Sequence, residues 1–175
     1  MTGGDGGQTR DRTPEMGPVR AEPFPLIGVL DNLRSAFNVG SIFRTAEAAR
    51  IAELRLCGIT PYPPHAQLDR TALGTANQVP WRHHVDTLAA VRELQARGLP
   101  VWAVETGERS RSIREVSFPQ PVAVVFGHET AGVSDAVLRA ADGIVRIPLH
   151  GRKNSLNVAN AFAVVVFEIL RQWGG

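Results

Sequence analysis

The side chains best suited to chemistry lie in four polar, glycine-containing segments, each directly after an apolar run. The segments span residues 31–45, 105–110, 127–134 and 148–158. Their functional groups are mainly guanidinium, carboxylate, amide and hydroxyl groups. An arginine offers a planar fork of donors that suits a phosphate, and an asparagine offers both donors and acceptors. These groups suit the binding and positioning of a polar ligand.

Standard catalytic and nucleotide-binding motifs are missing from these segments. No G-x-G-x-x-G follows the first apolar run, which argues against a dinucleotide-binding fold. Gly127 and Gly132 have P-loop spacing, but Val133-Ser134 stands where a P-loop needs its lysine. There is no G-x-S-x-G motif, which argues against a hydrolase nucleophile. The histidines lack the spacing of metal ligands, so we expect no metal site. The single cysteine, Cys57, excludes an internal disulfide framework.

Apolar patterning predicts an α/β fold for the elements that position these segments. Residues 59–82 carry four prolines and are expected to form a long loop with a helical turn near 66–73. Strands alternate with helices, which predicts a mostly parallel sheet flanked by helices. In such a sheet ligands bind beyond the carboxyl ends of the strands, where the four polar segments lie. The predicted strands are 26–30, 54–57, 101–104, 122–126 and 144–147, and the predicted helices are 40–50, 87–97, 134–141 and 155–173.

Composition indicates one soluble globular domain. Of the 175 residues, 43% are hydrophobic and 21% are charged. The net charge is only +2, so contacts with any polyanion would rely on local arginines rather than on long-range attraction. Residues 1–23 are rich in glycine and proline and predict a flexible N-terminal tail before a folded domain at 24–175. No membrane-length apolar run or signal-peptide core is found, so we expect a cytoplasmic protein with no membrane partner.

Three of the polar segments are distinctive when taken together. They read Asn38-Val-Gly-Ser-Ile-Phe-Arg44, then Gly127-His-Glu129-Thr-Ala-Gly132, then Ile147-Pro-Leu-His-Gly151 followed by Asn154-Ser155-Leu156-Asn157. In this order they resemble the three signature motifs of the SpoU/TrmH family of RNA ribose 2′-O-methyltransferases, within the SPOUT superfamily. The resemblance covers about residues 24–173. It implies a SPOUT-type fold with a C-terminal deep trefoil knot. The glycines at 127, 132 and 151 suit the close backbone approach or positive φ of such a knot, and ordinary turns at strand ends would also account for them.

The resemblance also implies a cofactor, S-adenosyl-L-methionine, and a role for each matching residue. By position, the cofactor contacts fall on Glu105, Thr106, Gly127, Ile147, Ser155 and Leu156. The implied catalytic residues are Arg44, Asn38, Glu129, Ser155 and Asn157. Arg34, Arg152 and Lys153 lie beside the motifs and, with Arg44, are the candidate RNA-binding residues; Arg152 and Lys153 could instead be surface residues that favour solubility.

Local structural roles compete with some of these assignments. Asn38, Ser155 and Asn157 lie near predicted helix starts and could each serve as a cap instead. Glu129 could pair with an arginine of the same site. Arg44 is not a simple base, because a guanidinium does not readily release its proton; it is expected to hold a phosphate and stabilise the emerging alkoxide.

The sequence therefore predicts an enzyme that methylates a ribose 2′-hydroxyl of tRNA or rRNA. The final helix is apolar almost all round, which favours a homodimer, the usual state implied by the resemblance. Two alternatives remain. One is a related SPOUT enzyme that methylates an RNA base, against which the Asn38/Arg44 pattern and the Ser155-Leu156-Asn157 run argue. The other is a non-catalytic RNA-binding protein of the same fold, against which the complete set of site residues argues.

Overall fold

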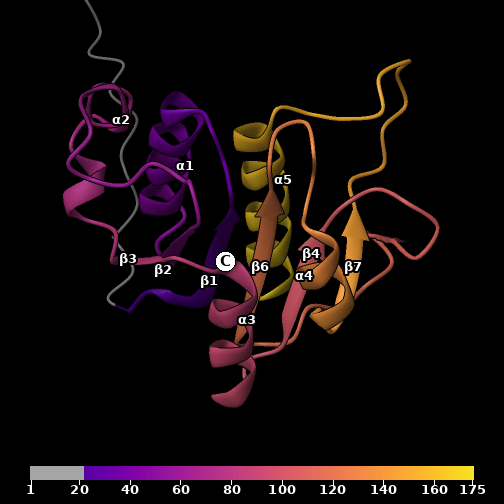
Figure 1. The fold of residues 1–175 in the computed structure, drawn as a ribbon. Coiled ribbons are helices and arrows are strands. Elements are labelled where there is room, and N and C mark those ends of the chain that lie inside the picture. The colour runs from indigo at the N-terminus through magenta and orange to yellow at the C-terminus, as the bar shows by residue number, and fades with distance from the viewer. Residues whose placement is uncertain (1–21) are drawn as a thin grey trace, which may run out of the picture.

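A single parallel sheet organises the chain. The structure is a computed structural model that describes residues 22–175, and its seven strands run in the order β3-β2-β1-β6-β4-β7-β5 (Figure 1). Every strand pair is parallel, as predicted. The strands are β1 (Phe24–Asp31), β2 (Ile51–Cys57), β3 (Trp81–His84), β4 (Val101–Val104), β5 (Arg111–Ser112), β6 (Val122–Gly127) and β7 (Gly143–Arg146).

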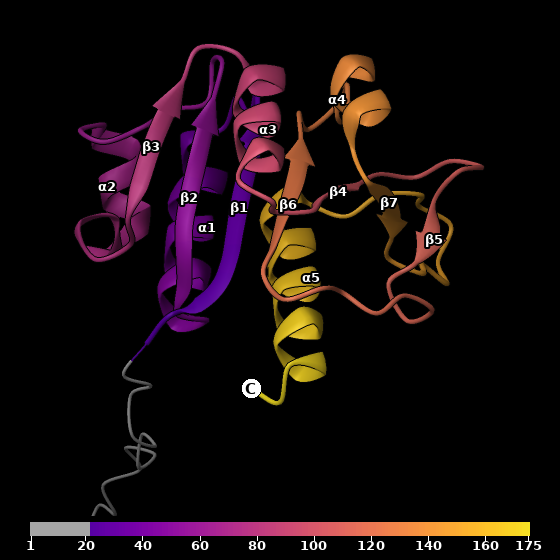
Figure 2. The ribbon, with the colours of Figure 1, turned by 90° about the horizontal axis from the view of Figure 1, so that it is seen from below.

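Helices cover both faces of this sheet, as Figure 2 shows. α1, α2 and α5 pack on one face, and α3 and α4 pack on the other. Both faces of the central strands are therefore buried, which explains why these strands read as continuous apolar runs. The helices are α1 (Ala36–Ala48), α2 (Ala66–Ala72), α3 (Thr87–Ala96), α4 (Asp135–Ala140) and α5 (Val158–Gln172), with a 3₁₀ turn at Thr75–Asn77.

The boundaries of two helices differ from the sequence prediction. α1 begins at Ala36, four residues earlier than predicted, because the Ser35 hydroxyl caps it by accepting a hydrogen bond from the Asn38 amide at 3.2 Å. α5 begins at Val158 rather than at residue 155, because Asn157 is its cap. Helix α3 follows its predicted cap, Asp86, whose carboxylate accepts a hydrogen bond from the Ala89 amide at 2.6 Å.

The stretch 59–82 is more ordered than a loop. The predicted helical turn is α2, and Trp81 begins β3, which the sequence analysis missed. Strand β3 reads Trp-Arg-His-His and pairs only with β2 at the sheet edge, so it lacks the apolar pattern of a central strand. The two-residue strand β5 at the opposite edge was missed for the same reason.

The ends of the described chain meet at the amino edge of the sheet. The rings of Phe24, the first residue of β1, and Trp173, just after α5, lie 6.4 Å apart, and the Gly175 amide donates to the Leu170 carbonyl oxygen at 2.9 Å. The tail predicted over residues 1–23 lies almost wholly outside the described residues, so it stays a prediction. Over residues 22–175 no helix combines the length and the apolar character that crossing a membrane requires.

A charged cluster centred on the buried Arg55 lies between β2, β3 and α3. Arg55 is fully buried, with Nε 2.7 Å from Glu53 Oε1 and Nη1 3.2 Å from Glu93 Oε1. The same Nη1 lies 2.6 Å from Nε2 of His84, so that nitrogen must accept and His84 must be neutral. Burial, and next the Arg55 charge, lower the pKa of His84 below its ordinary value of 6.5, against the opposing effect of Glu93 and Glu53.

A pH dependence of stability follows from this cluster. As pH falls below about 6.5, the unfolded chain takes up a proton at His84 before the folded chain does, so the free energy of unfolding falls. His84→Gln keeps an acceptor for Arg55 but does not titrate. We expect the loss of stability between about pH 7.5 and about pH 5.5 to be clearly smaller in this variant, as measured by urea unfolding. The matched control, His150→Gln on an exposed loop, should keep the wild-type pH dependence, and an unchanged dependence in His84→Gln would contradict the assignment.

Candidate functional site

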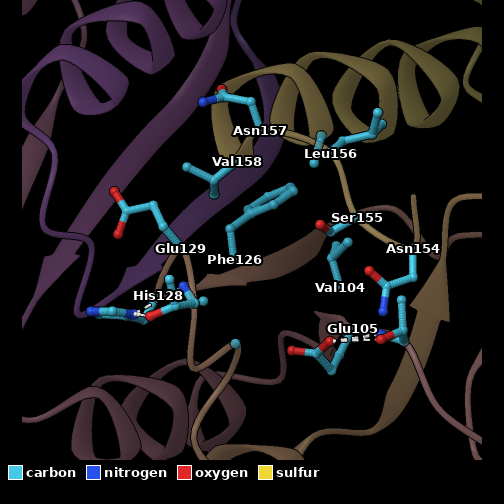
Figure 3. A pocket seen from close by; sticks show the side chains of 15 residues that line it. Val104, Glu105, Phe126, His128, Glu129, Asn154, Ser155, Leu156, Asn157 and Val158 are labelled. Carbon is cyan, nitrogen blue, oxygen red and sulfur yellow. Dashed lines mark hydrogen bonds between the residues drawn. The ribbon is translucent and has the colours of Figure 1, made fainter. Parts of the chain in front are cut away.

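A cavity of about 480 Å³ opens at the carboxyl edge of the sheet, beyond β4 and β6 (Figure 3). It is formed by three of the four polar segments singled out from the sequence: 105–110, 127–134 and 148–158. Its size is typical of a site for a small ligand. Fifteen residues line it: Val104, Glu105, Thr106, Phe126, Gly127, His128, Glu129, Thr130, Gly132, Asn154, Ser155, Leu156, Asn157, Val158 and Ala161.

Close backbone contact fixes the turn that follows β6. The amides and carbonyls of His128 and Gly132 exchange hydrogen bonds of 3.0 and 2.9 Å, so the chain folds back on itself. A Cβ on Gly127 would lie 2.2 Å from the backbone of Gly132 and Val133, which no side chain can accommodate. The close backbone approach at Gly127 and the positive φ of Gly132 thus fit the requirement for glycine, and both serve this local turn. The prediction for Gly151 is wrong, because a Cβ there would meet no atom and its φ is not positive.

Two carboxylates hold consecutive amides of this turn from opposite sides. Glu105, directly after β4, accepts from the Val133 amide at 3.0 Å through Oε2 and from the Thr106 amide at 2.7 Å through Oε1. Asp31, the buried last residue of β1, accepts from the Ser134 amide at 2.9 Å and from the Thr87 hydroxyl at 2.5 Å. The loops after β1, β4 and β6 and the start of α3 are therefore joined into one unit.

A third carboxylate joins the turn to α1. Glu129 accepts from the amides of Arg34 and Ser35, both at 3.0 Å, and from the side-chain amide of Asn38 at 3.1 Å. Partial burial alone would raise the pKa of Glu129, but the hydrogen bonds from Arg34, Ser35 and Asn38 outweigh it and lower this pKa below its ordinary value. Glu129 is therefore a carboxylate at neutral pH, placed where the N-terminus of α1 favours negative charge.

The chain of hydrogen bonds continues from Asn38 to α5. Nδ2 of Asn157 donates to Oδ1 of Asn38 at 3.1 Å, while Oδ1 of Asn157 accepts from the Ala159 and Asn160 amides at 2.9 and 3.4 Å. Asn157 is thus both a helix cap and a wall of the cavity. Glu129, Asn38 and Asn157 come from three separate segments and form one connected set.

The competing local roles raised by the sequence are resolved as follows. Asn38 is not a cap, because Ser35 fills that position. Ser155 is not a cap either: it precedes α5, is exposed, and lines the cavity. Within the described residues Glu129 pairs with the backbone amide of Arg34 and not with a guanidinium. Glu105, Thr106, Gly127, Ser155 and Leu156 all line the cavity as predicted.

Ile147 is the one predicted cofactor contact that does not line the cavity. It lies instead in a separate hollow, beside Ile113 and the α5 residues Val164 and Phe167. Sequence reasoning also missed several residues that do line the cavity, chiefly Phe126, His128 and Asn154. Each of them lies in or next to a polar segment that follows a strand. This position in the sequence was the only feature that could have predicted their place in the cavity.

The predicted basic residues do not line the cavity. Arg34 and Arg44 are exposed, and neither guanidinium has a hydrogen-bond or ion-pair partner among residues 22–175. Arg44 lies six residues along α1 from Asn38, which corresponds to a rise of about 9 Å along the helix axis. Arg152 and Lys153 are exposed on the loop that leads to Asn154.

The lining of the cavity fits a ligand that carries a positive charge and an apolar ring. It contains two carboxylates, Glu105 and Glu129, and no lysine or arginine. Figure 3 shows Phe126 between them, with Glu129 and Asn157 on one side and Glu105 on the other. S-adenosylmethionine has a sulfonium cation and an adenine ring, so the residues present fit this group. No three His, Cys, Asp or Glu side chains within the described range are grouped to hold a metal.

Comparison with known proteins points to one family. The model of the SpoU rRNA Methylase family matches residues 25–167. The chain is 38% identical over 144 residues to a tRNA (guanosine(18)-2′-O)-methyltransferase of Thermus thermophilus, covering 82% of this chain and 73% of that protein. It is 34% identical over 158 residues to the 23S rRNA (guanosine-2′-O-)-methyltransferase RlmB of Pseudomonas aeruginosa, covering 87% of this chain and 61% of RlmB.

Solved structures agree with this match. An AdoMet-bound rRNA methyltransferase from Sinorhizobium meliloti superposes with a TM-score of 0.79 at 31% identity, covering 89% of this chain and 58% of that one. A structure described as giving insight into the 2-OH methylation of C/U34 on tRNA superposes with a TM-score of 0.76 at 32% identity, covering 86% of this chain and 97% of that one. The chain thus spans about three-fifths of the rRNA methyltransferases that it resembles.

Proposed function

The chain belongs to the SpoU rRNA methylase family of S-adenosylmethionine-dependent RNA ribose 2′-O-methyltransferases, and we propose that the cavity together with α1 forms its active site. The observation that carries this proposal is the connected set Glu129–Asn38–Asn157, which joins the cavity to the helix that bears Arg44. The proposed substrate is the ribose 2′-hydroxyl of a nucleotide in tRNA or rRNA, the two RNA classes named for its relatives.

The cofactor would lie against Glu105, Thr106, Gly127, Ser155 and Leu156, all of which line the cavity. When bound there, S-adenosylmethionine supplies a methyl group on a positively charged sulfur. The backbone of Gly127 and the fixed turn to Gly132 provide a rigid wall, and the negative charge of Glu105 favours a cationic ligand.

Arg44 would act on the RNA and not on the cofactor. Its exposed guanidinium can hold a phosphate through two parallel hydrogen bonds and stabilise negative charge that develops on the 2′-oxygen. A guanidinium does not serve as the base, so the 2′-hydroxyl proton passes to the bound phosphate or to water. Asn38 and Asn157, held in fixed orientation by Glu129, would position the ribose.

The reaction class is tested by incubating the protein with radiolabelled S-adenosylmethionine and total RNA. We expect labelled 2′-O-methyl nucleosides after complete digestion of the RNA. Label on a base would instead support the alternative of a base methyltransferase. Absence of transfer together with retained RNA binding would support the non-catalytic alternative. Ribose-methylation mapping in a deletion strain then identifies the nucleotide.

Arg44→Lys keeps the charge of Arg44 but loses its planar fork. We expect kcat for methyl transfer to fall at least about tenfold, because removing one well-placed donor from developing negative charge commonly costs far more. Affinity for S-adenosylmethionine, measured by calorimetry, should not change, because Arg44 lies outside the cavity. The matched control is Arg92→Lys, an exposed change on α3 at the opposite face of the sheet. Methyl transfer at the wild-type rate by Arg44→Lys would rule out the proposed role.

Glu105→Gln removes one negative charge from the cavity and keeps the shape of the side chain, with one of the two acceptor oxygens that bind the Thr106 and Val133 amides. We expect it to weaken binding of S-adenosylmethionine about tenfold and to weaken binding of the uncharged-sulfur product, S-adenosylhomocysteine, much less. Calorimetry measures both ligands, and Glu108→Gln, an exposed change in the same loop, is the control. An equal loss of affinity for both ligands would show that Glu105 acts only by holding the loops in place through its hydrogen bonds.

We also propose that the protein is a homodimer that pairs through α5. Asn160, Val164, Phe167 and Arg171 form an exposed stripe along this helix, and Val164 and Phe167 are 42% and 51% exposed. The hollow beside them contains Ile113 and Ile147, so the stripe continues into an apolar groove that a second copy would cover.

Phe167→Glu combined with Val164→Glu should shift the protein from dimer to monomer, because the change would bury two charges at the interface. Light scattering after size exclusion measures the mass. Leu73→Glu, at an exposed apolar position outside this stripe, should leave the mass unchanged. A wild-type chain that elutes as a monomer would refute the proposal directly.

Two further expectations remain proposals. The trefoil knot implied by the resemblance is supported by the position of residues 154–158, which line the same cavity as the ends of β4 and β6. A cytoplasmic location is supported by the RNA substrates named for the relatives.

A further inference from the structure

A second group of ring side chains lies at the same carboxyl edge of the sheet but outside the cavity. The ring centroid of Tyr62, in the loop after β2, is 4.4 Å from that of His83 and 6.0 Å from that of Trp81. Tyr62 is 44% exposed, and Ile59 in the same loop is 64% exposed. Trp81 and His83 lie on the same face of β3, because side chains alternate along a strand. We call Ile59, Tyr62 and His83 the edge patch.

The edge patch is held rigidly. The ring nitrogen Nε2 of His83 lies 3.1 Å from the Gly58 carbonyl oxygen. The Thr60 hydroxyl, fully enclosed beneath the loop, donates toward the carbonyl oxygens of Cys57 at 2.7 Å and Leu30 at 3.1 Å. A rigid aromatic surface loses little conformational freedom when a flat ligand binds, which favours binding.

The same loop is tied to the segment that leads into the active site. The Ile59 amide donates to Oδ1 of Asn32 at 3.2 Å, and the Leu33 amide donates to the Thr60 hydroxyl at 3.0 Å. The next residue, Arg34, is exposed and gives its amide to Glu129. The loop of the edge patch is therefore joined through Asn32 and Leu33 to Arg34, and through the Arg34 amide to the cavity residue Glu129.

The distance between the edge patch and the cavity suits a short stretch of RNA. The sheet order β3-β2-β1-β6 places three strand spacings between the edge patch and the cavity, or about 14 Å at about 4.8 Å for each spacing. Stacked nucleotides rise by about 3.4 Å each, so roughly four of them cover this distance.

We propose that the edge patch binds an unpaired base of the RNA substrate by stacking on Tyr62, a few nucleotides from the methylated ribose, with Arg34 on the intervening phosphates. This inference rests on the proposed function, since it requires RNA at the cavity. An exposed aromatic ring stacks on any base, which is how proteins hold single strands. The patch has only three side chains, whereas a stable protein interface buries about 800 Å² on each partner. The patch therefore favours RNA over a protein partner.

Tyr62→Ala tests the proposal by steady-state methyl transfer to total RNA from a strain that lacks the gene. We expect the RNA KM to rise about tenfold, the effect of losing one stacked base, with kcat at saturating RNA and affinity for S-adenosylmethionine unchanged. Tyr62→Phe keeps the ring and should match the wild type. Tyr62→Leu keeps apolar volume without the ring and should behave as Tyr62→Ala, which separates stacking from packing.

Leu73→Ala, a still more exposed apolar position at the C-terminal end of α2, is the matched control and should leave the RNA KM unchanged. Filter binding of the same RNA by the same variants needs no turnover, so it tests the patch even if the wild type transfers no methyl group. Wild-type RNA affinity in Tyr62→Ala, or a fall in kcat alone, overturns the inference while leaving the proposed function intact. A wild-type protein that methylates no RNA overturns the proposed function instead.

Discussion

Backbone amides at the carboxyl edge of the sheet need acceptors, and three carboxylates supply them. Helix starts and tight turns leave N–H groups without partners inside the chain, and leaving such a group buried and unpaired is costly. Asp31, Glu105 and Glu129 each follow or end a different strand, and each accepts from the amide of a loop that follows another strand. The loops are therefore fixed relative to one another, although none of them is regular structure. The walls of the cavity and the orientation of Asn38 depend on this arrangement.

Charge is distributed in a way that suits two ligands of opposite sign. Among the described residues, the cavity presents carboxylates and apolar surface without a lysine or arginine, whereas Arg34, Arg44, Arg152 and Lys153 are exposed outside it. Under the proposed function, a cationic cofactor and a polyanionic strand would therefore occupy different places and would not compete. With a net charge of only +2, this separation has to be local, because the chain as a whole attracts nucleic acid weakly.

The sequence was most informative where one physical effect dominated. Burial on both faces made β6 a continuous apolar run, and the Asp86 cap marked the start of α3. It was least informative at the edges, where β3 is held by pairing with β2 and not by an apolar pattern. At the site, most of the residues that line the cavity were predicted from two features: their position directly after a strand and the resemblance to the family motifs. They could not predict that Ile147 faces a different hollow, because that depends on how the chain turns after β7.

The contact between Phe24 and Trp173 has a practical implication for protein engineering. Both termini of the described chain emerge together at the amino edge of the sheet, with the cavity and the edge patch at the opposite, carboxyl edge. A reporter or affinity handle joined at Glu22 or Gly175 would therefore leave the domain at the amino edge, on the side opposite the cavity.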